Sequence, residues 1–207
     1  METAAWQGSL LAEDGPGYDH GFSHLERFDL AEGAWLERRA GWVTGADELY
    51  TTVRDRMGWE QGTELIHGKR LLQPRLTAHV PVDAMPAGLE LFTRLGTVLS
   101  TRYGVWFERI GINWYRDGRD SVAWHGDRIA RDRPEATIAI VSLGEARPFR
   151  YRPAAGGASG SFRLGHGDLL VMGGSFQRTW RHAVPKVAAA GPRISVTYRH
   201  AYPPRRP

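Results

Sequence analysis

The sequence predicts an α+β protein in which two helices precede a β-sandwich or barrel. Two observations support this prediction. From Val105 onward, short runs rich in Val, Ile, Tyr, Phe and Trp alternate with Gly, Pro and Asp turns, and about eight such runs with few helices between them are typical of a sandwich or barrel. Upstream of them, two segments carry apolar residues at helical spacing.

The composition suits one globular domain without cysteine chemistry. The chain has 207 residues, of which 42% are hydrophobic and eight are tryptophan, enough for a packed core. There is no cysteine. Disulfides, cysteine-based zinc sites, iron–sulfur clusters and thiol nucleophiles are therefore excluded, and any metal must be held by histidine and carboxylate ligands.

The charge is mildly basic and is carried almost entirely by arginine. The formal net charge is +4, and only Lys69 and Lys186 among the 27 basic residues are lysines. Arginine binds phosphate and carboxylate groups bidentately, so an anionic partner is plausible. A GC-rich genome is an equally good explanation of the arginine excess.

The N-terminal residues contain neither a basic leader nor an apolar core, and no stretch approaches the roughly 18 apolar residues of a membrane span. We therefore expect a cytoplasmic protein without a membrane partner. Nothing indicates an obligate protein partner, so we expect a monomer.

The first half of the chain is predicted to contain an irregular lead-in and two core-facing helices. Residues 1 to about 25 are rich in Gly and acids without periodicity. Thr44 is expected to cap a helix that ends near Gly58, and Pro86 to open a second that ends at Gly104. Their apolar stripes contain Leu49, Tyr50, Val53 and Met57 in the first helix, and Leu89, Phe92, Leu95 and Leu99 in the second.

Between these helices, Gly62 to Asp83 looks like strands and loops that could form a lid beside the barrel mouth. We predict that residues 1–104 form a helical and lid region packed on a core of residues 105–207, the two together making one structural unit. The expected strands of the core are 106–116, 122–127, 136–143, 147–151, 160–164, 168–172, 176–184 and 192–199.

A candidate metal site begins with His125-Gly126-Asp127. Residues i and i+2 of a strand point to the same face, so His125 and Asp127 project together. One more ligand would complete a face of two histidines and one carboxylate, which leaves positions open on iron. A His-x-Asp alone is more often a chance occurrence.

Two histidines downstream could supply the third ligand. His166 lies between two glycines in a turn, where a side chain usually faces solvent. His182 lies late in a strand-like run, which fixes a ligand better than a turn does. We therefore choose His182.

Two strands present polar residues that suit a dicarboxylate. From Arg193 to Arg199, alternation puts Arg193, Ser195, Thr197 and Arg199 on one face, and buried arginines require an anion. From Phe107 to Tyr115, the same alternation puts Arg109, Gly111, Asn113 and Tyr115 together. Each pattern alone has a simpler explanation. The arginines from Arg193 to Arg199 could lie on an exposed sheet face, and Asn113 and Tyr115 could be a polar pair beside a turn.

Taken together and in order, these motifs resemble the AlkB family of Fe(II)/2-oxoglutarate dioxygenases. The segments that carry the resemblance span roughly residues 105–200 and are Asn113 to Gly118, His125 to Asp127, Ile140 to Gly144, Gly167 to Met172, His182 to Lys186 and Arg193 to Arg199. Upstream, only the general layout is similar. The resemblance implies that the core is a double-stranded β-helix, or jelly roll.

The resemblance also implies the site residues, cofactors and reaction. His125, Asp127 and His182 would bind Fe(II). Tyr115 and Arg193 would hold the distal carboxylate of 2-oxoglutarate; Asn113 and Arg199 would lie nearer its metal-bound end, and Ser195 could also contact it. With O2, such an enzyme converts 2-oxoglutarate to succinate and CO2 and hydroxylates an N-alkyl group on a base, which is then lost as an aldehyde. The implied partner is alkylated DNA, or RNA, and the implied role is repair by direct reversal.

Two departures from the family pattern concern the substrate. Members that act on methylated adenine or cytosine often carry an acid directly after the His-x-Asp motif, where this chain has Arg128-Ile129. The lid region also lacks an obvious aromatic pair for a flipped base. Trp124, Tyr103 and His79 are candidates, although strand parity favours a core position for Trp124.

Three hypotheses follow. The first is the nucleic-acid dealkylase, for which a rim of Lys69, Arg70, Arg75, Arg128, Arg131 and Arg133 could contact phosphates. The second is a dioxygenase acting on RNA, a protein side chain or a small molecule. The third is a non-catalytic nucleic-acid-binding jelly-roll protein, which we rank last because no ligand or co-substrate arginine is missing.

Overall fold

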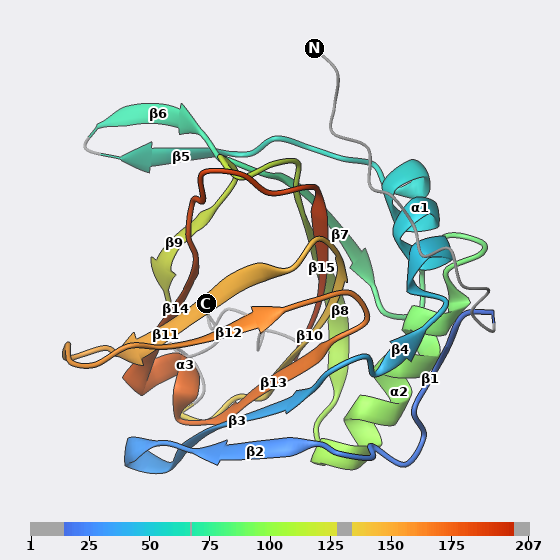
Figure 1. Cartoon of the computed structure of the whole chain (residues 1–207), viewed down its shortest axis with the longest axis horizontal. Helices are drawn as coiled ribbons and strands as arrows, with labels where there is room; N and C mark the ends of the chain where they lie inside the picture. The colour runs from blue at the N-terminus through green and yellow to red at the C-terminus, as the bar shows by residue number, and fades with distance from the viewer. Residues whose placement is uncertain (1–14, 67, 128–133, 201–207) are drawn as a thin grey trace, which may run out of the picture.

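Two antiparallel sheets facing each other form the body of the protein (Figure 1). The computed structural model describes residues 15–66, 68–127 and 134–200. The larger, or major, sheet consists of β2 (Glu26–Asp29), β3 (Ala34–Arg39), β13 (Leu169–Gly174), β10 (Ile138–Gly144), β15 (Arg193–His200), β8 (Phe107–Tyr115) and β7 (Leu76–Pro81), in that order. The smaller, or minor, sheet consists of β12 (Gly160–Leu164), β11 (Arg147–Pro153), β14 (Trp180–Val184) and β9 (Val122–His125).

The eight strands from β8 to β15 wind as a double-stranded β-helix. Strands β8, β10, β13 and β15 lie in the major sheet, whereas β9, β11, β12 and β14 lie in the minor sheet. The chain thus passes back and forth between the sheets, and every pairing within them is antiparallel. The predicted jelly-roll core is confirmed.

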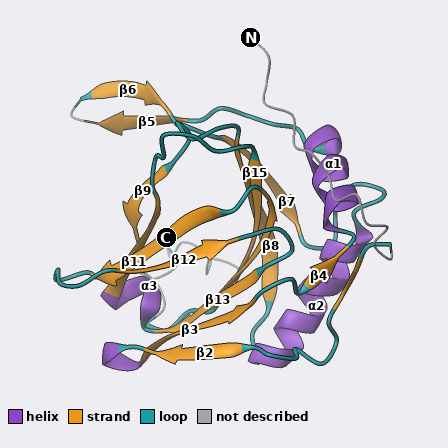
Figure 2. Cartoon of the chain, in the orientation of Figure 1, coloured by secondary structure: helices purple, strands orange, loops and turns teal. Residues whose placement is uncertain are grey.

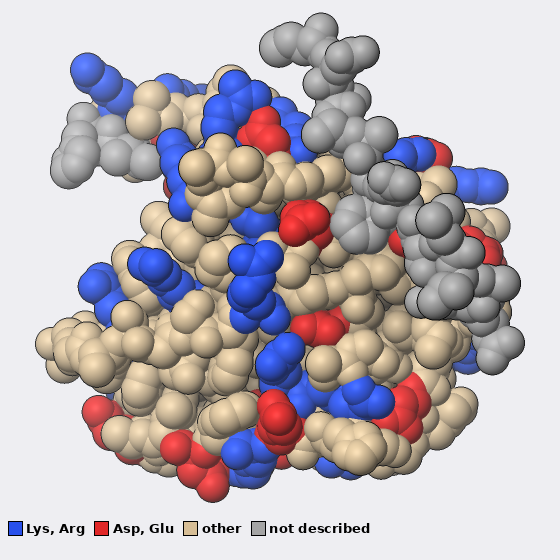
Figure 3. All heavy atoms as spheres, in the orientation of Figure 1, with Lys and Arg blue, Asp and Glu red and all other residues tan. Residues whose placement is uncertain are grey.

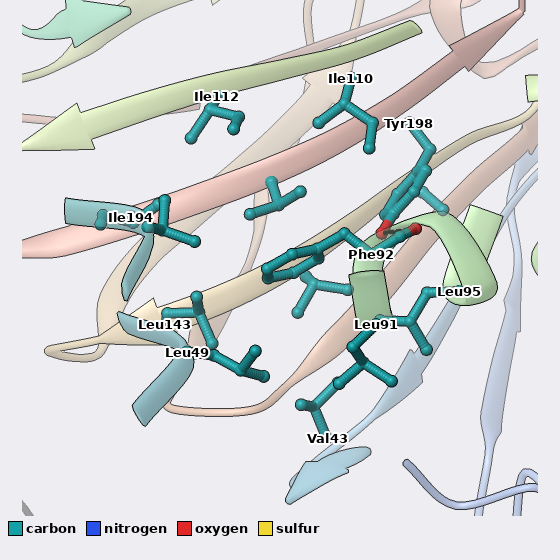
Figure 4. Packing of buried hydrophobic residues seen from close by; sticks show 14 of the residues in the cluster. Val43, Leu49, Leu91, Phe92, Leu95, Ile110, Ile112, Leu143, Ile194 and Tyr198 are labelled. Atoms are coloured by element: carbon teal, nitrogen blue, oxygen red, sulfur yellow. Dashed lines mark hydrogen bonds between the residues drawn. The ribbon is translucent and has the colours of Figure 1, made fainter. Parts of the chain in front are cut away.

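Two helices cover the outer face of the major sheet (Figure 2). Helix α1 (Ala46–Arg56) packs against β10, and α2 (Glu90–Tyr103) packs against β8. Their apolar stripes meet the outward-facing residues of the sheet, among them Ile110, Val141 and Val196. Figure 4 shows Phe92 and Leu95 of α2 packed over this face, where Tyr198 donates a hydrogen bond to the Phe92 carbonyl at 2.9 Å.

A second apolar cluster fills part of the space between the two sheets. Ile138 and Ile140 alternate with Ala139 and Val141 along β10, so the first pair faces the minor sheet and the second faces the helices. Phe149 of β11 belongs to the inner cluster. Because this cluster occupies only one end of the gap between the sheets, the other end remains available for polar side chains.

Small elements complete the first half of the chain. Strand β1 (Gly17–Tyr18), within the predicted lead-in region, pairs with β4 (Val43–Thr44) directly before α1, and a short 3-10 helix (Ala31–Gly33) joins β2 to β3. Strands β5 (Thr63–Ile66) and β6 (Lys69–Leu72) form a hairpin that projects from the body at the top of Figure 1.

Several sequence predictions were wrong in detail. Thr44 does not cap α1, because Gly45 precedes the helix at a φ of 61° and no side chain caps it. Helix α2 begins at Glu90 and not at Pro86, since the Pro86 carbonyl accepts a hydrogen bond from Leu89 in a turn. Residues 176–184 are not one strand, because α3 (Phe176–Thr179) precedes β14.

The sequence also gave no indication of β2 and β3, which extend the major sheet beside β13. Charged residues interrupt their alternation, so no apolar period was visible.

Within the described residues, no helix combines the length and apolar character that a membrane span requires.

The end of α2 provides a test of the backbone geometry. Gly104 adopts a φ of 62° at the C-cap, and a Cβ there would meet no atom within 4 Å. Gly104→Ala should therefore lower the free energy of unfolding by about 1 kcal/mol through backbone strain alone. Gly58 has equal space around it and no left-handed φ, so Gly58→Ala is the matched control. Urea denaturation showing equal losses in both variants would contradict this assignment.

Candidate active site

A pocket of about 1340 Å³ includes the space between the inner faces of the two sheets and extends to residues of α2 such as Thr93 and Thr97. The major sheet contributes alternate residues of three adjacent strands, including His79, Gly111 and Thr197. The minor sheet contributes residues of β9 and β14. Both sets of polar side chains predicted from strand parity on β8 and β15 line this pocket.

His125 and His182 lie directly opposite each other on the antiparallel strands β9 and β14. Their ring centroids are 4.2 Å apart. Nδ1 of His125 lies 2.8 Å from the Ala123 carbonyl, which can only accept, so Nδ1 carries the proton. In the neutral ring, this tautomer leaves the lone pair on Nε2, the nitrogen that a metal-binding imidazole would use.

His182 is held as a neutral imidazole. It is buried, and Phe149 stacks on its ring at 5.3 Å. Burial first, and then His125, lower the pKa of His182 to about 3. Nδ1 of His182 is buried without a hydrogen-bond partner among the described residues, and such an atom is usually satisfied by a ligand or water.

Asp127 completes the group as an ionised carboxylate. Burial opposes the charge, but Arg199, His182 and His125 outweigh it and lower the pKa of Asp127. Its Oδ1 lies 3.9 Å from Nε2 of His125. Nε and Nη2 of Arg199 donate to Oδ2 and Oδ1 at 3.2 and 3.4 Å.

The residues fit a divalent metal by chemistry, although their arrangement is not that of a formed centre. In the parts of the chain that the structure covers, no three His, Asp or Glu side chains are arranged to hold an ion. We attribute this to Arg199, which engages both oxygens of Asp127. Two imidazoles and a carboxylate are nevertheless the donors that non-haem iron takes, and Nδ1 of His182 is buried without a hydrogen-bond partner among the described residues.

A cationic group without a carboxylate lies deeper in the pocket. Arg193 is 2% exposed, and its Nε donates to Ser142 Oγ at 2.9 Å. Its Nη1 is buried without a partner, and no described carboxylate forms an ion pair with it. Its guanidinium carbon lies 5.4 Å from the centroid of the Tyr115 ring. A buried cation with an unmet donor is a receptor for an anion.

Asn113 and Ser195 lie between this cation and the histidines. Nδ2 of Asn113 donates to Ser195 Oγ at 3.3 Å, and its Oδ1 accepts a hydrogen bond from Arg75 Nε at 3.0 Å. Arg75 also donates to the Ser121 carbonyl at 3.4 Å. The predicted rim residue Arg75 is thus inside the pocket, where it orients Asn113.

Of the remaining candidates from the sequence, Trp124 lines the pocket, whereas His166 and Tyr103 lie elsewhere. His166 contacts Asp47 of α1 at 3.1 Å and accepts a hydrogen bond from the Gly144 amide, so it belongs to the outer core. Tyr103 donates to Glu37 at 2.6 Å and does not line the pocket. Trp124 is half-buried outside the two core clusters and lies under Arg152, so its expected core position was wrong. Arg128, Ile129, Arg131 and Arg133 fall outside the described residues.

Sequence reasoning missed two residues that support the site. Gln177 is buried in α3, and its Oε1 accepts the Asp127 amide at 2.9 Å. Its carbonyl lies 2.3 Å from where a Cβ on Gly126 would be, which explains the glycine between the two ligand candidates. The signal was absent because residues 176–184 looked like one strand. Arg147, buried behind Tyr115, gave no signal because its strand also carries the exposed Arg150 and the partly buried Arg152.

Comparisons with known proteins agree with this geometry. The family model of the 2OG-Fe(II) oxygenase superfamily matches residues 36–199. Alpha-ketoglutarate-dependent dioxygenase alkB homolog 3 of Homo sapiens is 30% identical over 185 residues, covering 78% of this chain and 63% of that protein. DNA oxidative demethylase ALKBH2 of Arabidopsis thaliana is 32% identical over 180 residues, covering 68% of this chain and 57% of that protein. The chain thus spans less than two thirds of the length of these relatives.

Solved structures share the fold at lower identity. A 2OG-Fe(II) oxygenase family protein from Burkholderia pseudomallei superposes with a TM-score of 0.55 at 19% identity, covering 77% of this chain and 81% of that chain. OsALKBH1 superposes with a TM-score of 0.57 at 13% identity, covering 85% of this chain and 100% of that chain.

Burial of His182 makes stability depend on pH. In the unfolded chain His182 has its ordinary pKa of 6.5, whereas in the fold the pKa is about 3. Between these values only the unfolded state binds the proton, so stability falls as the pH falls. The full linkage is on the order of 5 kcal/mol.

His182→Leu removes this linkage, so unfolding free energies measured in metal-free protein from about pH 7 to about pH 4 should decline less steeply than in the wild type. The same slope in both proteins would show that His182 is not buried as a neutral imidazole.

Proposed function

The chain belongs to the 2OG-Fe(II) oxygenase superfamily, and we propose that it is an Fe(II)/2-oxoglutarate-dependent dioxygenase that removes N-alkyl groups from damaged nucleic-acid bases. The observation that carries the proposal is the polar inner face of the barrel. Across it, two histidines and a carboxylate share the lining with Arg193, a buried arginine that lacks an anionic partner among the described residues. Its similarity to AlkB-like relatives supports the same reading.

In this proposal His125, Asp127 and His182 hold the metal. Bound Fe(II) supplies the oxidation chemistry, in which 2-oxoglutarate and O2 yield succinate and CO2 while an alkyl C–H bond is hydroxylated and the carbon leaves as an aldehyde. The protein's own task is to keep His182 neutral and Asp127 ionised. Burial lowers the pKa of His182, and Arg199 lowers that of Asp127.

The co-substrate would bind along the same face. Tyr115 and Arg193 would take the distal carboxylate, because Arg193 keeps an unmet donor in a buried position. Asn113, Ser195 and Arg199 would lie along the rest of the molecule toward the metal. Arg199 is then shared between Asp127 and the co-substrate, so binding can draw its guanidinium away from the carboxylate.

A nucleic-acid substrate is supported first by the relatives, one of which is named a DNA oxidative demethylase. It is supported second by the outward face of the minor sheet. The four strands of this sheet contain no acidic residue. Four arginines alternate outward there and form what we call the arginine face: Arg150, Arg152, Arg163 and Arg181.

The arginines of this face are poorly neutralised by the protein. Arg152 and Arg181 stand directly opposite each other on β11 and β14, an arrangement of like charges that destabilises a sheet. Arg152 lies 4.3 Å from the centroid of the Trp124 ring, and Trp124 is the residue before His125. Figure 3 shows Lys and Arg side chains over this sheet. A polyanion beside the pocket would neutralise them.

The hairpin of β5 and β6 supports the predicted lid. It exposes Leu65, Leu71 and Leu72 together with Lys69 and Arg70. A two-stranded hairpin with exposed apolar residues is only marginally stable by itself. Glu64 of this hairpin and Gln73 just after it line the pocket, so a substrate in the pocket would lie beneath it.

One sequence feature favours a different substrate for the same enzyme. No acid follows Asp127, where Arg128 and Ile129 stand. RNA, a protein side chain or a small molecule therefore remains the second candidate.

Succinate formation tests the proposal directly. Anaerobically purified, Fe(II)-loaded protein given 2-oxoglutarate and O2 should form succinate faster with single-stranded DNA containing 1-methyladenine or 3-methylcytosine. His125→Ala should abolish this turnover, because a metal ligand is lost. Succinate formation that no alkylated oligonucleotide stimulates would contradict the proposed substrate class. No succinate formation by the iron-loaded protein would contradict the proposed enzymatic activity.

The arginine face can be tested by salt dependence. Each lost phosphate contact should reduce the slope of log affinity against log salt by roughly 0.7 for single-stranded DNA. We expect this smaller slope in Arg150→Gln and in Arg152→Gln when the affinity for single-stranded DNA is measured by fluorescence anisotropy at several salt concentrations. Arg56→Gln on α1 and Arg94→Gln on α2 remove the same charge from exposed helix positions and should leave the slope unchanged. An equal reduction of the slope in the helix variants and in the arginine-face variants would mean that DNA binding depends on net charge and not on the arginine face.

A further inference from the structure

A second arginine is buried behind the proposed co-substrate site. Arg147, at the start of β11, is 1% exposed, and it forms no ion pair with any carboxylate among the described residues. Its guanidinium donates instead to three backbone carbonyls, each at 2.9 Å: those of Asp117, Asp120 and Pro185. Its Nε is buried without a partner. A buried cation with only neutral acceptors is costly, so its retention requires a reason.

The three carbonyls belong to segments that lead into or out of the strands bearing the metal candidates. Asp117 and Asp120 lie in the loop before β9, which carries His125. Pro185 directly follows β14, which carries His182. Arg147 thus joins the approach to one strand to the exit of the other, and a planar fork is suited to hold two segments at once.

Arg147 also shares an aromatic neighbour with Arg193. Its guanidinium carbon lies 5.8 Å from the Tyr115 ring centroid, while that of Arg193 lies 5.4 Å from the same centroid. Burial lowers the pKa of both arginines, and the charge of Arg147 lowers that of Arg193 further. Two buried guanidinium groups therefore repel each other across one phenol.

The nearest acids do not relieve this repulsion by hydrogen bonding. Asp120 is engaged by Arg116 through bonds of 2.7 and 2.9 Å. Asp168 accepts the Gly41 and Gly165 amides, each at 2.9 Å. These acids attract the two arginines through space, but the pKa of each arginine remains lowered, so the acids do not fully compensate the buried positive charge where a distal carboxylate would bind. A ligand bearing that second carboxylate gains from both cations, whereas a monocarboxylate gains from neither.

We infer that Arg147 is a positioning residue that sets the preference of this pocket for a dicarboxylic 2-oxo acid over a monocarboxylic one. It acts through Tyr115 and Arg193 and does not itself line the pocket. The inference rests on the co-substrate site proposed above. It predicts that the charge on residue 147, rather than its size, controls the preference.

The test compares two ligands that differ only in the distal group. Affinities for 2-oxoglutarate and for 2-oxobutanoate are measured by calorimetry on the full chain loaded with Mn(II), so no turnover is needed. Arg147→Gln should reduce the ratio of these affinities roughly tenfold, as expected for a lost buried charge interaction. Arg147→Lys, which keeps the charge, should stay within about threefold of the wild-type ratio. Arg56→Gln, on the exposed surface of α1, is the control for loss of charge elsewhere.

Equally weakened binding of both ligands by Arg147→Gln would overturn the inference, because a purely structural role of Arg147 predicts that result. An unchanged ratio of the two affinities would overturn it as well. A ratio as low in Arg147→Lys as in Arg147→Gln would also overturn it. If Arg147→Gln does not fold, Arg147→Met fills the same space without charge and replaces it, because apolar substitutes for buried ions are often tolerated. Failure of the wild type to bind 2-oxoglutarate would contradict the proposed function itself.

Discussion

The pairing of β9 with β14 is the interaction on which the candidate site depends. It sets His125 directly opposite His182, with ring centroids 4.2 Å apart. Strand β9 has only four residues and forms the edge of the minor sheet, so β14 and the loop before β9 must fix its position. Arg147 and Gln177 do this from two sides: the first holds the loop, and the second holds the Asp127 amide. Strand β9 ends at His125, so Asp127 lies just beyond it and not within a strand 122–127 as predicted, and its position depends on these contacts.

The two faces of the major sheet have separate tasks. Its outer face packs against α1 and α2 through Ile110, Val141 and Val196 and supplies most of the apolar burial. Its inner face can then carry charged groups such as Arg193 and Arg199, whose burial costs free energy that the outer core offsets. The same division explains why Arg193 keeps an unmet donor in the ligand-free fold. The fold tolerates this cost, and an anionic ligand would remove it.

Strand parity made much of the site predictable from sequence. A period of two determines which side chains share a face, so it paired Asn113 with Tyr115 on one strand and Arg193 with Ser195 on another; the family resemblance then assigned both pairs to one co-substrate site, and all four residues line the pocket. Parity does not reveal which strands are neighbours or what supports them. The His125–His182 pairing depends on a crossover between sheets, which only the topology supplies.

Residues whose role is to support others were the hardest to find. Gln177 was hidden because α3 has only four residues and is flanked by strand-forming sequence. Strands β2 and β3 were hidden because their charged residues, such as Arg27 and Glu37, pair across the sheet edge and break the apolar alternation. These features arise from tertiary contacts, which local patterns do not encode.

The central claim is that His125, Asp127 and His182 together bind one metal ion. Its most direct test is the stoichiometry and affinity of Fe(II) binding under anaerobic conditions, in the wild type and in His182→Gln. The account predicts one ion per chain, with affinity reduced at least roughly tenfold in the variant, because a direct ligand is removed. Unchanged stoichiometry and affinity in His182→Gln would show that iron binds elsewhere and would contradict the site.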